Sequence, residues 1–215
     1  MLGVLLHAKG DYAAAQACFE QSLAIHMRLF GDEHSDVAQD LNNLAVMSRL
    51  QGDDVKAESM LRQALAIRRR VYGNKHMETA QSLNNLVAVM LNRQEYSGAE
   101  SLCTEVLAIR RELLGNDHPL VAQAIHNLGV LLGRMGRIAE AESLLRQSID
   151  LYRVKLGPDH PDLAGGLHNL GELLLLAGET EKAEPLLGEC LEIRRRSFPL
   201  ATLERSRHFK RLAAA

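Results

Sequence analysis

The sequence predicts an all-α protein built from stacked helical repeats. Gly31, Gly73, Gly115 and Gly157 are spaced by 42 residues, and six further columns of identical residues share this period. Internal repeats of this length are typical of helical solenoids. Aromatic residues make up only 4% of the chain and Trp is absent, which argues against a β-sandwich or barrel core. Long runs rich in Ala, Leu, Glu and Arg favour helices instead.

Each repeat is predicted to contain two helices. In the first full repeat, apolar residues at three- and four-residue spacing predict a first helix (helix A) over 35–51 and a second (helix B) over 54–71. Gly52 breaks the chain between them, and Pro119 and Pro161 lie where the first turn of a later helix A tolerates proline. The full repeats are therefore expected over 31–72, 73–114, 115–156 and 157–198.

The two ends of the chain follow the same register. Residues 1–30 align with the end of helix A and with helix B, so we expect a truncated first repeat, with the chain beginning inside a longer array. Residues 1–10 resemble a short signal sequence but have neither a basic start nor a small-residue cleavage site, so a targeting peptide is the less favoured alternative. Residues 199–215 are expected to form a polar capping helix and tail.

Composition and charge exclude several classes of function. Lys and Arg total 25 and Asp and Glu total 27, a net charge of −2, which lacks the basic excess of a nucleic-acid or membrane-surface binder. No apolar stretch approaches the roughly 20 residues of a membrane span. No phosphate loop, nucleophile motif or paired-carboxylate site stands out. We expect no enzyme and no cofactor and, with three cysteines, a reducing, cytoplasmic location.

Two periodic sets of basic residues are interpreted as structural. The set His34, His76, His118 and His160 is expected to cap or pack the turns from helix B to helix A. A metal site is not expected, because equivalent positions in stacked helices are about 10 Å apart whereas Zn–N bonds measure about 2 Å. The column of Arg69, flanked by Arg68, Arg70, Arg110, Arg194 and Arg196, is expected to form a basic ridge that complements the helix dipole. A patch that binds phosphate or an acidic partner is the less favoured alternative.

The repeats resemble tetratricopeptide repeats, which have Leu–x–x–Leu–Ala/Gly in helix A and Ala in helix B. The pattern Gly–x–x–His–Pro–x–x–Ala–x–x–Leu–Asn–Asn–Leu–Ala is similar to the 42-residue type of kinesin light chains and nephrocystin-3, over residues 1–198. The resemblance implies a right-handed superhelix whose concave groove, lined by successive helices A, takes extended peptides. In kinesin light chains these are cargo peptides with a tryptophan among acidic residues.

Polar residues on helix A are the candidate groove residues. Amide side chains there could pair a donor and an acceptor with the backbone of an extended peptide. The main set is Gln39, Asn42, Asn43, Gln81, Asn84, Asn85, Gln123, His126, Asn127, His168 and Asn169. A second set, Arg49, Asn92 and Arg134, lies one turn further along, where Arg would suit acidic ligands. Two alternatives stay open: the second Asn column bonds the backbone of the adjacent helix and only holds the stack together, and the Arg set is a solvated helix end.

Two functions are compatible with these features. The first is a non-catalytic interaction scaffold that binds an extended peptide of a protein partner or cargo, as kinesin light chains do. The alternative is a self-association or signalling module of a larger multidomain protein, with a homodimer formed through the apolar face of the truncated first repeat.

Overall fold

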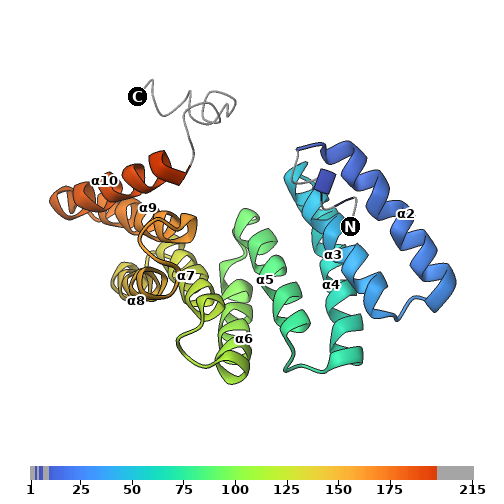
Figure 1. Cartoon of the computed structure of the whole chain (residues 1–215). Coiled ribbons are helices and arrows are strands. Elements are labelled where there is room, and N and C mark those ends of the chain that lie inside the picture. The colour runs from blue at the N-terminus through green and yellow to red at the C-terminus, as the bar shows by residue number, and fades with distance from the viewer. Residues whose placement is uncertain (1–2, 4, 7–9, 198–215) are drawn as a thin grey trace. The chain divides into compact units, whose positions relative to one another are not determined.

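The computed structural model describes residues 3, 5–6 and 10–197. Between residues 12 and 197 nine helices follow one another, and no strand occurs in the described part (Figure 1). They are α2 (Tyr12–Phe30), α3 (Ser35–Leu50), α4 (Asp54–Tyr72), α5 (Met77–Asn92), α6 (Tyr96–Leu114), α7 (Pro119–Arg134), α8 (Ile138–Leu156), α9 (Pro161–Leu176) and α10 (Thr180–Ser197). The capping helix expected over 199–215 lies outside the described residues.

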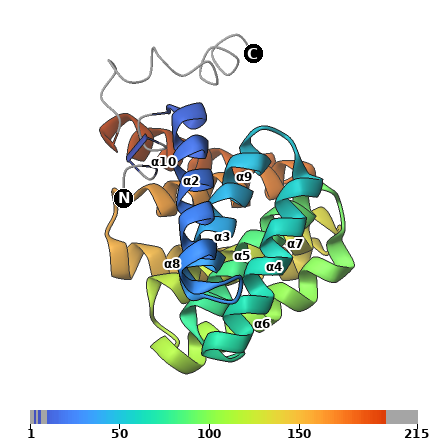
Figure 2. The same cartoon turned by 90° about the vertical axis from the view of Figure 1, so that its right-hand side faces the viewer.

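The chain divides into two compact units, residues 1–113 and 114–215. In the first unit α2 packs on α3, α3 on α4 and α4 on α5; in the second, α7 packs on α8, α8 on α9 and α9 on α10. The odd-numbered helices of a unit also touch, α3 with α5 and α7 with α9 (Figure 2). Within each unit, consecutive helices A therefore lie next to one another, as the repeat pattern predicts.

The turn from helix B to helix A has the same construction in four repeats. The histidine set caps helix A: each Nδ1 accepts the N–H of the residue two positions on, with distances of 3.3, 3.2, 3.1 and 3.1 Å. This confirms the expected capping role. The periodic glycines precede these caps with φ between +79° and +90°, a left-handed conformation that favours glycine. The short turns from helix A to helix B use the same conformation, with Gln94 at φ 61° in the turn between α5 and α6.

The predicted apolar positions form the core. On α3, the residues Val37, Leu41, Leu44, Ala45 and Met47 are all buried. In the second unit, Leu163, Leu167, Leu170 and Leu174 of α9 pack against apolar side chains of α8 and α10. Helix α9 therefore shares its core with α8 of the preceding repeat and with α10 of its own repeat. No helix in the described part of the chain has the length and hydropathy needed to cross a membrane.

Candidate functional site

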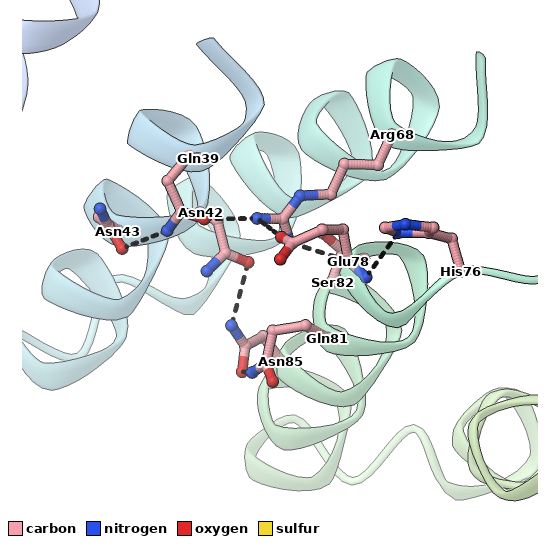
Figure 3. Close-up of polar contacts among 9 residues, drawn as sticks. All are labelled: Gln39, Asn42, Asn43, Arg68, His76, Glu78, Gln81, Ser82 and Asn85. Atoms are coloured by element: carbon pink, nitrogen blue, oxygen red, sulfur yellow. Dashed lines mark hydrogen bonds and ion pairs between the residues drawn. The ribbon is translucent and has the colours of Figure 1, made fainter. Parts of the chain in front are cut away.

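Amide side chains form matching pairs on α3 and α5. Gln39 Nε2 donates to Asn43 Oδ1 at 3.0 Å, and Gln81 Nε2 donates to Asn85 Oδ1 at 3.2 Å. In each pair the two residues are four apart and so share one face of their helix. Both Gln side chains are exposed and both Asn side chains are partly exposed. Two neighbouring helices A thus present the same amide pattern to solvent (Figure 3).

A further amide bond joins the two helices. Asn85 Nδ2 donates to Asn42 Oδ1 at 3.0 Å, and Asn42 is only 5% exposed. Asn42 therefore lies within the contact between α3 and α5 rather than on an open surface. Asn85 does bond the adjacent helix, but through the Asn42 side chain and not through the backbone as the alternative had it. Its Oδ1 stays paired with the exposed Gln81 (Figure 3).

A buried arginine of α4 contacts both helices. Arg68 Nη2 donates to Gln39 Oε1 at 2.7 Å and lies 2.7 Å from the Glu78 carboxylate. Its Nη1 donates to the Glu78 carbonyl and to Ser82 Oγ, each at 2.9 Å. Burial lowers the pKa of Arg68, and the neighbouring Glu78 carboxylate opposes that shift. One guanidinium thereby connects helix A of one repeat with helix A of the next.

This arrangement corrects the expected basic ridge. Arg68 and Arg110 are each 1% exposed, so neither belongs to a solvated surface. The sequence did contain a signal that Arg68 is buried, because Arg68 follows Leu61, Ala64 and Leu65 at the three- and four-residue spacing of the buried face. Arg69 does lie at the surface, where its Nη2 pairs with Glu105 of α6 at 2.7 Å.

The second unit uses a histidine where Asn42 stands in the first. His126 Nε2 lies 3.0 Å from Asn169 Nδ2, the same contact between helices A that Asn42 and Asn85 make. Because the amide nitrogen can only donate, this contact needs a neutral His126 whose Nε2 accepts. Nδ1 of His126 is buried and has no hydrogen-bond partner in the described part of the chain. Burial lowers the pKa of His126, which favours this neutral imidazole.

The other candidates are spread along the helices A. His168 Nε2 lies 3.3 Å from Glu172, and Asn84, Gln123 and Asn127 are partly exposed. Asn92 Nδ2 donates to Asp54 Oδ1 of α4 at 3.4 Å. Arg49 is partly exposed in the last turn of α3. The structure therefore brings together the amides of α3 and α5, and His126 with Asn169, but places Arg49 and Asn92 at helix ends.

A hollow of about 220 Å³ lies beside Arg134 and Asn169 in the second unit. Its lining includes the apolar side chains of Val130, Leu145, Leu173 and Leu176, together with Arg134, Asn169 and Glu172. Gly129 and Gly133 line the same hollow, at positions where the first full repeat has Ala45 and Arg49. Its volume is below the roughly 300–1,000 Å³ of a drug-sized ligand pocket, so it suits a side chain. These two glycines were the sequence signal for it.

The repeated acidic column is used in structural contacts. Glu58 pairs with Arg62 of the same helix and with Arg93 of the next repeat, and Glu142 pairs with Arg146. Across residues 3, 5–6 and 10–197, no group of three or more His, Cys, Asp or Glu side chains is placed to hold a metal ion.

Comparison with known proteins identifies the repeat. The tetratricopeptide repeat profile matches residues 1–70, 41–97, 78–153 and 135–196, and no curated protein matches the sequence. The fold is similar to BtubC (BKLC) from P. vanneervenii, at 24% identity and a TM-score of 0.76 over 91% of this chain and 78% of that one.

Two further solved structures are similar. One is a Podosopora anserina protein assigned as a kinesin light chain with nearly identical TPR-like repeats, at 23% identity and a TM-score of 0.74 over 91% of this chain and 92% of that one. The other is the Rap conjugation gene regulator of plasmid pLS20 in complex with a Phr peptide, at 16% identity and a TM-score of 0.73 over 90% of this chain and 52% of that one. The helical hairpins and the profile match together show that this chain belongs to the tetratricopeptide repeat family.

Proposed function

We propose that this protein is a non-catalytic interaction scaffold whose helices A bind an extended peptide segment of a partner protein. The observation that carries the proposal is the amide pair repeated on α3 and α5, Gln39 with Asn43 and Gln81 with Asn85. Amides offer both donors and acceptors to a peptide backbone. Packed helices lie about 8–10 Å apart, which an extended chain spans in about three residues. The amide pairs of α3 and α5 can therefore each bind a backbone group of the same peptide, about three residues apart.

The second unit supports a side-chain contribution. The hollow is lined mainly by apolar residues, with Arg134, Asn169 and Glu172 among them. We infer that it suits an apolar side chain, with Arg134 as the candidate partner of a neighbouring acidic residue. A peptide with a tryptophan among acidic residues, as in kinesin light chain cargo, is our first candidate. The similarity to kinesin light chain-type repeats and to a Rap protein in complex with a peptide favours a peptide partner. A cytoplasmic location suits the three free cysteines.

Self-association is a second candidate, favoured by one surface of α2. Ile25 and Leu29, four residues apart on this helix, are 52% and 62% exposed. The equivalent of Ile25 in the second full repeat, Ile109, is only 5% exposed. An apolar strip of this kind can mark an interaction site.

Fluorescence anisotropy with labelled peptides tests the proposal. The panel contains Trp-centred acidic peptides, scrambled versions of them, and neutral extended peptides. The Asn43→Ala/Gln81→Ala variant removes two exposed amides, and Gln63→Ala, on the exposed face of α4, is the matched control. A hydrogen bond contributes about 0.5–1.5 kcal/mol, so we expect about tenfold weaker binding in the double variant and unchanged binding in the control.

Two results would count against a peptide groove. Equal affinity of the double variant and the wild type would remove the amide face from the site. A panel without any binding, together with a mass that rises with protein concentration in light scattering, would favour self-association through α2.

A further inference from the structure

A facing pair of residues, 14 positions apart in the sequence, joins helix B of one repeat to helix A of the next. Between α2 and α3, His26 Nδ1 lies 2.7 Å from Asp40 Oδ2. Between α4 and α5, Arg68 Nη1 donates to Ser82 Oγ at 2.9 Å (Figure 3). Asp40, Arg68 and Ser82 are each at most 5% exposed, so both pairs lie inside the contacts between repeats.

The equivalent pair of the second unit consists of a large residue and a residue without a side chain. Tyr152 of α8 is 2% exposed, and Gly166 of α9 is buried. A Cβ on Gly166 would lie 3.8 Å from Tyr152 Cδ2 and only 2.9 Å from Ile149 Cγ1, which is closer than packed carbon atoms approach one another. The glycine therefore leaves the room that these two side chains of α8 occupy.

These two positions vary along the chain, although other columns of the repeat are identical. The helix B column is His26, Arg68, Arg110 and Tyr152, and the helix A column is Asp40, Ser82, Ala124 and Gly166. In the three pairs whose contacts are described above, a larger side chain of helix B faces a smaller residue of helix A. The polar members face a group that can bind them. The two columns are thus complementary at each of these interfaces.

Exchanging partners between the interfaces would leave a buried group without its complement. Opposite Tyr152, the Asp40 carboxylate would be buried without a histidine, and a buried unpaired charge is costly. Opposite a glycine, Arg68 would lose a hydroxyl acceptor, and a buried donor without an acceptor destabilises the folded state. Beside Ile149, a residue with a Cβ would be overpacked. Each helix A therefore fits its own helix B better than it fits the others.

We propose that these matched pairs determine which repeats can stack on one another. Each helix A accepts the helix B that precedes it and rejects the helices B of other repeats, whether they belong to the same chain or to a second copy. Specificity of this kind comes from unfavourable contacts with the wrong partner. The glycine, histidine and apolar columns cannot supply it, because they are alike in every repeat. This proposal is independent of the proposed peptide-binding function.

Moving a pair from one interface to another tests the matching. Tyr152→Arg/Gly166→Ser gives α8 and α9 the pair that Arg68 and Ser82 form between α4 and α5. Hydrogen exchange of the full chain, followed by mass spectrometry, reports the opening equilibrium of α9. Each single variant should accelerate exchange in α9, and the double variant should exchange more slowly than either. Neighbouring residues couple by amounts that correspond to a factor on the order of ten, and we expect a coupling of this size.

The second unit already contains the other groups that a buried arginine needs at this position. Besides Ser82, the Arg68 guanidinium is held by Gln39 Oε1 and by the carbonyl and carboxylate of Glu78. The equivalent positions of the second unit are Gln123 and Asp162, again an amide and a carboxylate. The transplanted pair therefore changes the two matched positions and leaves their supporting residue types in place.

A second transplant and a matched control complete the experiment. Tyr152→His/Gly166→Asp introduces the histidine and aspartate pair at the same interface and should also exceed additivity. The control, Val154→Arg/Gly165→Ser, introduces the same residue types as the first transplant on the same two helices. Val154 is 77% exposed, and a Cβ on Gly165 would meet nothing within 4 Å. The effects of the two control substitutions should therefore simply multiply.

The matching would be overturned by a Tyr152→Arg/Gly166→Ser variant whose exchange in α9 is accelerated by the product of the two single effects. An unfolded double variant whose two single variants both fold would overturn it as well. A folded double variant of which one single variant does not fold would support it. If the first double variant and both of its single variants fail to fold, the transplant of histidine and aspartate decides by the same criteria.

Discussion

At the scale of single residues, histidine has two different roles that share one requirement. In the caps, Nδ1 of His34 and its equivalents accepts a backbone N–H at the start of helix A. In the contact between α7 and α9, Nε2 of His126 accepts from Asn169. Both roles need an unprotonated ring nitrogen, because a protonated imidazole only donates. The four capping histidines therefore belong to helix ends, and His126 belongs to a contact between helices.

The partly buried His126 predicts a pH dependence of stability. Burial lowers its pKa below the ordinary 6.5 in the folded protein, so the unfolded chain binds a proton more readily than the folded one. Its contribution to stability is present above pH 6.5 and is lost as the pH falls through the lowered pKa. The test is urea unfolding of the wild type and of His126→Asn, which places here the residue type that the first full repeat has at Asn42. The free energy of unfolding should fall less with decreasing pH in the variant than in the wild type.

The matched control for this measurement is His168→Asn. It changes the partly exposed histidine of the next repeat and retains His126. We expect the part of the acid-induced loss of stability that is due to His126 to remain in this variant. Parallel pH profiles of wild type and His126→Asn would show that His126 does not titrate differently in the two states.

At the scale of elements, glycines control how closely the helices pack. A Cβ on Gly171 of α9 would lie 2.6 Å from Leu187 Cδ2 and 2.7 Å from its Cγ, whereas a Cβ on Gly165 of the same helix meets nothing within 4 Å. Gly171→Ala should therefore destabilise by about 1–3 kcal/mol through overpacking. Gly165→Ala should stabilise by about 0.5–1 kcal/mol, because alanine is the better helix former.

Chemical unfolding of these two variants measures the effect. The opposite signs are the informative result, because both substitutions are chemically identical and lie in one helix. A gain of stability in both would mean that α10 can move away from α9 at little cost.

The element boundaries were predictable because glycine, histidine and apolar periodicity all repeat. Helix A was expected over 35–51 and is Ser35–Leu50, and helix B was expected over 54–71 and is Asp54–Tyr72. Side-chain partners were harder to predict from the sequence, because equivalent positions of successive repeats form different pairs. His26 bonds Asp40 at 2.7 Å, whereas Arg68 bonds Ser82. The periodicity identifies a buried face but does not say which group on the neighbouring repeat lies opposite.

This limit also explains the outcome for the amides. The shared spacing placed Gln39, Asn43, Gln81 and Asn85 on one face, and the structure agrees. The same spacing also separates the buried Asn42 from the partly exposed Asn43, because Asn42 lies four residues after Ala38 and three before Ala45, which are both buried. It could not predict the bond of Asn42 to Asn85, because that partner lies on the next repeat.

At the scale of the whole molecule, stability comes from apolar contacts between neighbouring repeats. Surface pairs join successive helices B in both units, Arg69 with Glu105 and Arg153 with Glu189. Exposed pairs of this kind contribute about 0–1 kcal/mol each. The core residues of α9, in contrast, are nearly inaccessible. Losing one of them should therefore affect mainly the repeats that pack on it.

Leu170→Ala tests this locality. Leu170 is 1% exposed within the core of the second unit, and truncating a buried leucine costs about 2–5 kcal/mol. Because each repeat contacts only its neighbours, hydrogen exchange measured by mass spectrometry should accelerate in α7–α10 and stay close to wild type in α3 and α4. Leu175→Ala, at a 45% exposed position of the same helix, should change neither region. An equal acceleration in α3 and α4 would instead mean that both units unfold as one cooperative body, so that stability is shared along the chain and local contacts do not limit it.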